Sequence, residues 1–146
     1  MKPENDLFLW HTSWFSLISA IFGSLVGKYD LALVIFGVFL TSINYWRNSH
    51  VVWAKNLDMT MVAISLTYHL VYAYGSPVGN YYFIITGLGM LCYPISLWCY
   101  KQNMLWAGTI AHSGIHTLGN MACLILMTDV SQELTVPAPP YGPVAL

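Results

Sequence analysis

Two histidines four residues apart, His112 and His116, lie near the middle of the apolar stretch Trp106–Met127. On a helix this spacing places both imidazoles on one face, and Asn120 continues that face by another turn. The stretch is long enough to cross a bilayer, where polar side chains are costly and usually functional. We therefore take it as the centre of a candidate site.

A third histidine, His69, is expected at the same depth. It follows Asp58 by almost three helical turns, so the two side chains share one face of a helix. At a rise of about 1.5 Å per residue, His69 lies roughly 18 Å from the start of its apolar segment. The same count from Asn103 places His112 at roughly 13 Å and His116 at roughly 19 Å. The sequence thus predicts one layer of three histidines.

Imidazoles at one depth can do several kinds of chemistry. His69, His112 and His116 could ligate a metal such as zinc, in the manner of three-ligand catalytic sites. Two of them could hold a haem or chlorophyll between helices, or the layer could relay protons or ions. A hydrogen-bonded polar core that joins helices is the structural alternative. The spacing leaves all four hypotheses open, and it lacks the Glu of the H-E-x-x-H metalloprotease motif.

Asp58 has two interpretations of its own. A carboxylate in the first turn of a helix is stabilised by the helix dipole, and Asn56 could cap that turn. Alternatively, Asp58 is a base, or orients a ligand, at the mouth of the histidine layer.

The composition requires an apolar solvent. The chain has 146 residues, of which 57% are hydrophobic and 8% charged, whereas soluble domains have about 25% charged residues. The net charge of -1 excludes a basic nucleic-acid-binding surface. The odd number of cysteines, Cys92, Cys99 and Cys123, predicts free thiols in apolar segments and no disulfide framework.

The hydropathy pattern predicts an all-α integral membrane protein with a single bundle of five transmembrane helices. Backbone groups in lipid must be satisfied within each segment, so the apolar segments are helices. The bundle covers residues 1–130, and a Pro-rich tail covers residues 131–146. The predicted spans are residues 8–26, 31–46, 57–74, 81–100 and 104–127.

Positive charges orient this bundle. With five spans, Lys2, Arg47, Lys55 and Lys101 lie on one side and Lys28 on the other. Short loops rich in Lys and Arg stay in the cytoplasm. The N-terminus is therefore predicted to be cytoplasmic and the C-terminus to lie on the opposite side.

The order of these polar residues resembles a superfamily of seven-span membrane hydrolases that includes alkaline ceramidases and adiponectin-receptor-like proteins. Those proteins carry Ser-x3-His, then an Asp that opens the next helix, then a His-x3-His in the last helix, around one zinc. Ser42, Asp58 and the pair His112 and His116 stand in this order here. Residue Trp46 replaces the histidine of the first motif, and two helices are absent.

The resemblance implies a zinc-dependent hydrolase of lipid amide or ester bonds. Asp58 would be its acid or base and Ser42 would assist the oxyanion, while His69 or His50 would have to supply the third zinc ligand. We weigh this enzyme against a non-catalytic subunit of a membrane assembly, which is our leading prediction, and against a proton or ion path. Its partners would be membrane lipids and other protein chains or further copies of itself.

Overall fold

The chain is helical over nearly all of the residues that the structure describes. In the computed structural model these are residues 3–129, and they contain no strand. The predicted all-α fold is confirmed, while the predicted Pro-rich tail lies outside the described residues. The helices are α1 Pro3–Thr12, α2 Trp14–Leu25, α3 Tyr29–Arg47, α4 Val52–Tyr74, α5 Gly79–Lys101 and α6 Leu105–Met127.

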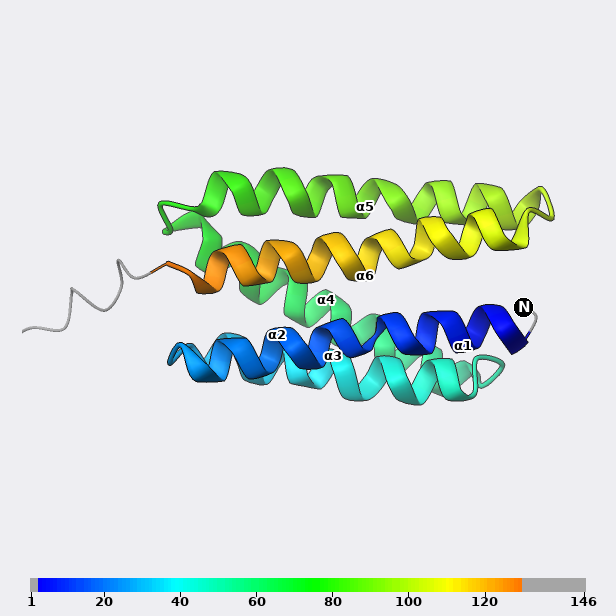
Figure 1. Ribbon diagram of the computed structural model, residues 1–146, viewed down its shortest axis with the longest axis horizontal. Helices are drawn as coiled ribbons and strands as arrows, with labels where there is room; N and C mark the ends of the chain where they lie inside the picture. Colours follow the sequence, from blue (N-terminus) through cyan, green and yellow to red (C-terminus); the bar gives the residue numbers. More distant parts are fainter. Residues whose placement is uncertain (1–2, 130–146) are drawn as a thin grey trace, which may run out of the picture.

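Helices α1 and α2 follow one another as a single rod (Figure 1). Ser13, which separates them, keeps helical backbone angles, with φ −63° and ψ −21°. Its backbone N–H donates to the Leu9 carbonyl at 3.1 Å. Together with α3 to α6 the chain thus forms five rods.

Two rods begin earlier than the sequence predicts. The first begins at Pro3 and not near residue 8, and α4 begins at Val52 and not near residue 57. Both extensions are polar, so the hydropathy pattern excluded them. The acidic residues Glu4 and Asp6 lie in the first turn of α1, where the helix dipole favours negative charge.

Two of the turns depend on a residue with a left-handed backbone. Gly27 has φ +79° after α2, and Asn103 has φ +59° after α5. In each case the next N–H donates back to a carbonyl five residues earlier, Lys28 to Gly23 at 2.8 Å and Met104 to Cys99 at 3.0 Å. This is the Schellman ending, for which Gly and Asn are the preferred residues.

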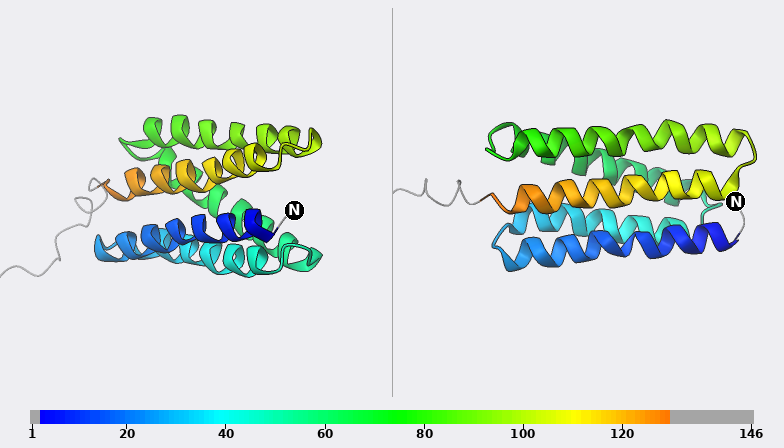
Figure 2. Two further views of the ribbon diagram at one scale, coloured as in Figure 1. Left: turned by 45° about the vertical axis from the view of Figure 1, so that its right-hand side comes forward. Right: turned by 45° about the horizontal axis from the view of Figure 1, so that its top comes forward.

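The rods run up and down in two antiparallel pairs. Helices α2 and α3 form one pair, and α5 and α6 form the other, while α4 crosses obliquely from the first pair to the second (Figures 1 and 2). Helix α6 also packs against α1 and α2. The start of α1 and the α3–α4 and α5–α6 connections lie at one end of the bundle (Figure 1). The α2–α3 and α4–α5 turns and the end of α6 lie at the other.

Three helices, α3, α5 and α6, are long and apolar enough to cross a membrane. Only 17% to 33% of the residues in their most apolar windows are buried within the bundle, so the rest face outward. Large apolar side chains such as Leu33, Ile84 and Ile110 are more than 60% exposed. Such surfaces suit lipid as the solvent. Helix α4 is as long, but it carries Lys55, Asp58 and His69.

Inside the bundle, the helices meet through small and polar side chains as well as apolar ones. Asn120 of α6 donates to the Ser16 hydroxyl of α2 at 3.1 Å. Asn5 of α1 donates to the Thr109 hydroxyl of α6 at 2.9 Å. Interhelical hydrogen bonds of this kind, with small residues at the contact, are the usual means of joining helices in a membrane. They bring α6 against the first rod and define one wall of the interior.

Candidate functional site

An interior cavity of about 290 Å³ lies between the helices and is partly open to the outside, and residues of α2 to α6 line it. Its wall is mostly apolar, and the polar residues among those that line it come from four helices, α2, α4, α5 and α6. They are Ser16, Asp58, Ser65, His69, Tyr82, Thr86, Tyr93, His112, His116 and Asn120. The three histidines of the predicted layer and Asp58, predicted at its mouth, therefore line one space.

The cavity is elongated along α4. Asp58 and His69 both line it, and eleven residues of helix correspond to about 16 Å. Its volume of about 290 Å³ is at the lower end of the roughly 300–1,000 Å³ that is typical of ligand pockets.

Asp58 forms the first end of the cavity. Its side chain is 8% exposed, and its Oδ1 atom accepts hydrogen bonds from Ser42 at 2.6 Å and Thr41 at 3.1 Å. Because α4 begins at Val52, Asp58 lies in its second turn, so the expectation that it stabilises the first turn is wrong. The hydroxyls of α3 hold it instead.

Ser42 does not take the position that an oxyanion donor needs. It is fully buried, its hydroxyl donates to Asp58, and it does not line the cavity. The structure thus places Ser42 beside Asp58, where its hydroxyl holds the carboxylate in position.

His69 forms the other end. The ring is 1% exposed and stacks on Tyr82, with ring centroids 6.4 Å apart and planes 14° apart. Its Nδ1 atom lies 2.7 Å from the Ser65 carbonyl oxygen, which can only accept, so Nδ1 carries the proton. In the neutral ring Nε2 is then an acceptor, and this atom is buried without a partner.

His112 and His116 lie side by side on α6, with ring centroids 5.6 Å apart. The Nε2 atom of His116 is also buried without a partner. His112 packs edge-on against Trp46 at 5.2 Å and against Tyr93 at 6.3 Å. The pair therefore sits between α3 and α5.

The three histidines line one cavity but do not form one metal-binding group. Within residues 3–129, no group of three or more His, Cys, Asp or Glu side chains could hold a metal ion. Trp46 fills the space beside His112 with its indole ring. His50, the other ligand considered, lines a separate groove with Asp6. The described residues therefore do not fit the three-imidazole zinc centre of the hydrolases.

The cysteines are free thiols, as the sequence predicts. Cys92, Cys99 and Cys123 are all free, and Cys123 lines the interior cavity. Packing and not cross-linking explains their apolar surroundings.

Sequence reasoning missed the aromatic residues of the cavity. Tyr82 and Tyr93 lie on α5 with the same eleven-residue spacing as Asp58 and His69, a signal that could have found them. Trp46 could have been found only as the residue that replaces a histidine four positions after Ser42.

No protein-family model, no curated protein and no solved structure matches this chain.

Proposed function

We propose that the chain is a non-catalytic, five-span membrane protein that holds an extended ligand in its interior cavity. The single observation that carries the proposal is the buried Nε2 atom of His69, an acceptor without a partner at one end of that cavity. Buried polar atoms are nearly always satisfied in native proteins, so an unsatisfied one needs an explanation. A bound molecule that donates a hydrogen bond to His69 supplies it.

The membrane placement rests on the five rods and on the distribution of charge. The first rod, α1 with α2, and the more polar α4 join the three apolar helices in one up-and-down bundle. Arg47, Lys55 and Lys101 all belong to one end of it, the end with the start of α1 (Figure 1). Under the positive-inside rule this end is cytoplasmic. A bundle of this size that exposes apolar surface on every helix suits a subunit of a larger membrane assembly.

The chemistry of the cavity limits the ligand. Its apolar wall favours an apolar chain, and His69 at one end accepts from a hydroxyl or an N–H group. At the other end, Oδ1 of Asp58 is already engaged by Ser42 and Thr41, which leaves the second carboxyl oxygen for a ligand. The ligand is therefore extended, with a hydrogen-bond donor at the end next to His69.

A metal ion is a second candidate occupant, and the 5.6 Å separation of the His112 and His116 rings favours it. Two imidazoles one helical turn apart can ligate one ion, with other ligands supplied from outside the chain. We derive no hydrolytic step, since no third imidazole joins them in the part of the chain that the structure describes. A proton path through the same cavity would instead require water between Asp58 and His69.

Native mass spectrometry of detergent-purified protein, with elemental analysis of the same sample, tests the proposal. We expect a bound organic mass in the natural protein and a much smaller bound fraction in His69→Phe, which keeps a ring against Tyr82 but removes the acceptor. His11→Phe is the matched control, because exposed His11 makes the same hydrogen bond, Nδ1 to the Leu7 carbonyl at 2.7 Å. It should keep the ligand. An empty cavity, or stoichiometric metal in place of an organic mass, would overturn the proposal.

A further inference from the structure

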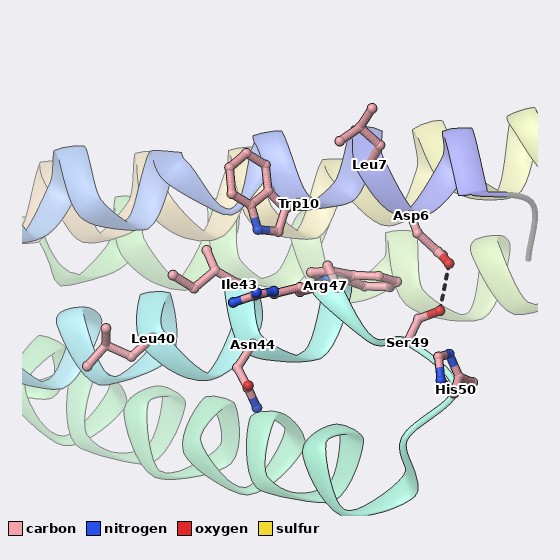
Figure 3. Close-up of a pocket in the computed structure, with 10 residues that line it drawn as sticks. Asp6, Leu7, Trp10, Leu40, Ile43, Asn44, Arg47, Ser49 and His50 are labelled. Carbon is pink, nitrogen blue, oxygen red and sulfur yellow. Dashed lines mark hydrogen bonds between the residues drawn. The ribbon is translucent and has the colours of Figure 1, made fainter.

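A second, larger space of about 830 Å³ lies between α1 and α3 at the bundle end that holds the N-terminus of α1 (Figure 3). It is an open groove, separate from the interior cavity. The residues that line it are Asp6, Leu7, Trp10, Leu40, Ile43, Asn44, Trp46, Arg47, Ser49 and His50. None of these residues lines the interior cavity. Trp46 touches one of that cavity's lining residues, His112.

The groove presents hydrogen-bond donors that have no acceptor in the protein. The Arg47 guanidinium makes no ion pair or hydrogen bond with another described residue, and neither does the Trp10 indole N–H. In Figure 3 both groups turn into the space between α1 and α3. A groove lined by a guanidinium and an indole N–H offers donors to phosphate oxygens, since Arg presents several donors in a planar fork.

The groove also presents a carboxylate. The Asp6 Oδ2 atom accepts a hydrogen bond from the Ser49 hydroxyl at 2.6 Å, while Oδ1 is buried without a partner. Asp6 and Arg47 do not pair with each other, although both line the groove. The groove therefore carries two separate charges of opposite sign, and a buried carboxylate oxygen requires a partner.

These groups follow one another along the groove in a definite order. Leu40 and Ile43 line the part toward the middle of the bundle, the guanidinium of Arg47 comes next, and Asp6 lies nearest the end (Figure 3). Leu40 is 47% exposed and Leu7 is 57% exposed, so the apolar wall is open to the outside. In the membrane placement proposed above, the groove therefore presents apolar side chains nearest the bilayer centre, then the positive charge of Arg47, and then the negative charge of Asp6.

We propose that this groove binds one phospholipid whose headgroup carries both a phosphate and a primary ammonium, as in phosphatidylethanolamine. The acyl chains would lie on Leu40 and Ile43, the phosphate on Arg47 and Trp10, and the ammonium on Asp6. This is the order in which the same groups occur in the lipid. The inference rests on the membrane placement proposed above, but not on the ligand of the interior cavity.

Native mass spectrometry of the full chain, purified from vesicles of equal parts phosphatidylethanolamine, phosphatidylcholine and phosphatidylglycerol, tests it. We expect retained phosphatidylethanolamine in preference to the other two. Arg47→Ala should lower the retained amount of every phospholipid about tenfold, the effect of losing a hydrogen bond to a charged group. Asp6→Asn can still accept from Ser49, so it should fold and bind phospholipid but lose the preference for the ammonium headgroup.

Lys101→Ala is the matched control, since it removes a cation at the same end of the bundle but outside the groove. It should leave retention unchanged. Gly119→Leu fills only the interior cavity, so it should also keep the phospholipid. This variant therefore distinguishes a failure of the groove proposal from a failure of the proposal for the interior cavity. Equal retention of the three lipids, an effect of Lys101→Ala equal to that of Arg47→Ala, or displacement by inorganic phosphate alone would each overturn the inference.

Discussion

At the scale of single residues, the carboxylate of Asp58 depends on the hydroxyl of Ser42. Ser42→Ala removes the 2.6 Å hydrogen bond to Oδ1 and leaves only Thr41 on that atom. We expect the free energy of unfolding to fall by about 1–3 kcal/mol, the amount for a buried charged acceptor that loses a donor. Thermal unfolding in detergent measures it.

Ser113→Ala is the control for this change, because the Ser113 hydroxyl bonds only to a carbonyl of its own helix. It should alter stability by a few tenths of a kcal/mol. Ser42→Ala should also be much milder in an Asp58→Leu background. If Ser42→Ala lowered the free energy of unfolding by the same amount in that background, Ser42 would act by packing and not through Asp58.

Trp46 packs against His112, at a position from which a histidine could join the imidazole pair of α6. Its ring lies 5.2 Å from His112, which is itself beside His116. Trp46→His should therefore assemble three imidazoles and raise bound zinc toward one ion per chain, from a low value in the natural protein. Elemental analysis after dialysis against zinc measures it, and Trp46→Phe is the control. Stoichiometric zinc in the natural protein that disappears in His69→Ala would instead restore the predicted site of His69, His112 and His116.

Helix geometry explains how much of the site can be predicted from the sequence. The spacings of Asp58 and His69, and of His112 and His116, place each pair on one face, and all four residues line the same cavity. Spacing cannot say how far apart two helices stand or which rotamer a ring takes. His69 bonds to the Ser65 carbonyl and stacks on Tyr82, while His112 packs against Trp46, and these contacts leave no periodic signal.

At the scale of elements, the turn between α4 and α5 requires a glycine. A Cβ atom on Gly79 would overlap the backbone carbonyl oxygen of Ala73, so Gly79→Ala must move the turn. We expect a loss of stability well above the average point mutation, which is about 1 kcal/mol. Gly87→Ala on the same helix meets no atom and should gain about 0.5–1 kcal/mol from helix propensity. Equal effects of the two would contradict this turn geometry.

Element boundaries show where hydropathy misleads. The segments around Glu4 and Lys55 are polar, so they read as connections, yet they are the first turns of α1 and α4. At the start of α1, tertiary contacts add to the favourable first-turn charges: Asn5 bonds to Thr109 and Asp6 to Ser49. Interactions between residues so far apart in the chain cannot be read from local composition.

At the scale of the whole molecule, the proposed five-span arrangement predicts on which side of the membrane each loop lies. A cysteine introduced by Asn48→Cys, in the α3–α4 connection, should react with a membrane-impermeant maleimide only from the cytoplasmic side. One introduced by Asn80→Cys, next to the α4–α5 turn, should react only from the opposite side. The three native cysteines lie within helices and provide the unlabelled background. Labelling of both positions from one side would contradict five spans.

The central claim is that the interior cavity holds a ligand, and filling the cavity tests it most directly. Gly119 lines the cavity, and a Cβ atom there meets nothing within 4 Å. Gly87 is equally open but faces outward and lies outside the cavity. Gly119→Leu and Gly87→Leu therefore make the same chemical change at two helix positions.

The decisive measurement is the bound organic mass of these two variants by native mass spectrometry. The proposal predicts that Gly119→Leu folds, is at least as stable as the natural protein, and loses the bound mass that His69→Phe also loses, while Gly87→Leu keeps it. Phospholipid in the groove between α1 and α3 should remain on both variants. Stability should not fall, because leucine replaces a helical glycine and occupies free space. A ligand retained in full by Gly119→Leu, or lost equally from both variants, would contradict the claim that the cavity is its binding site.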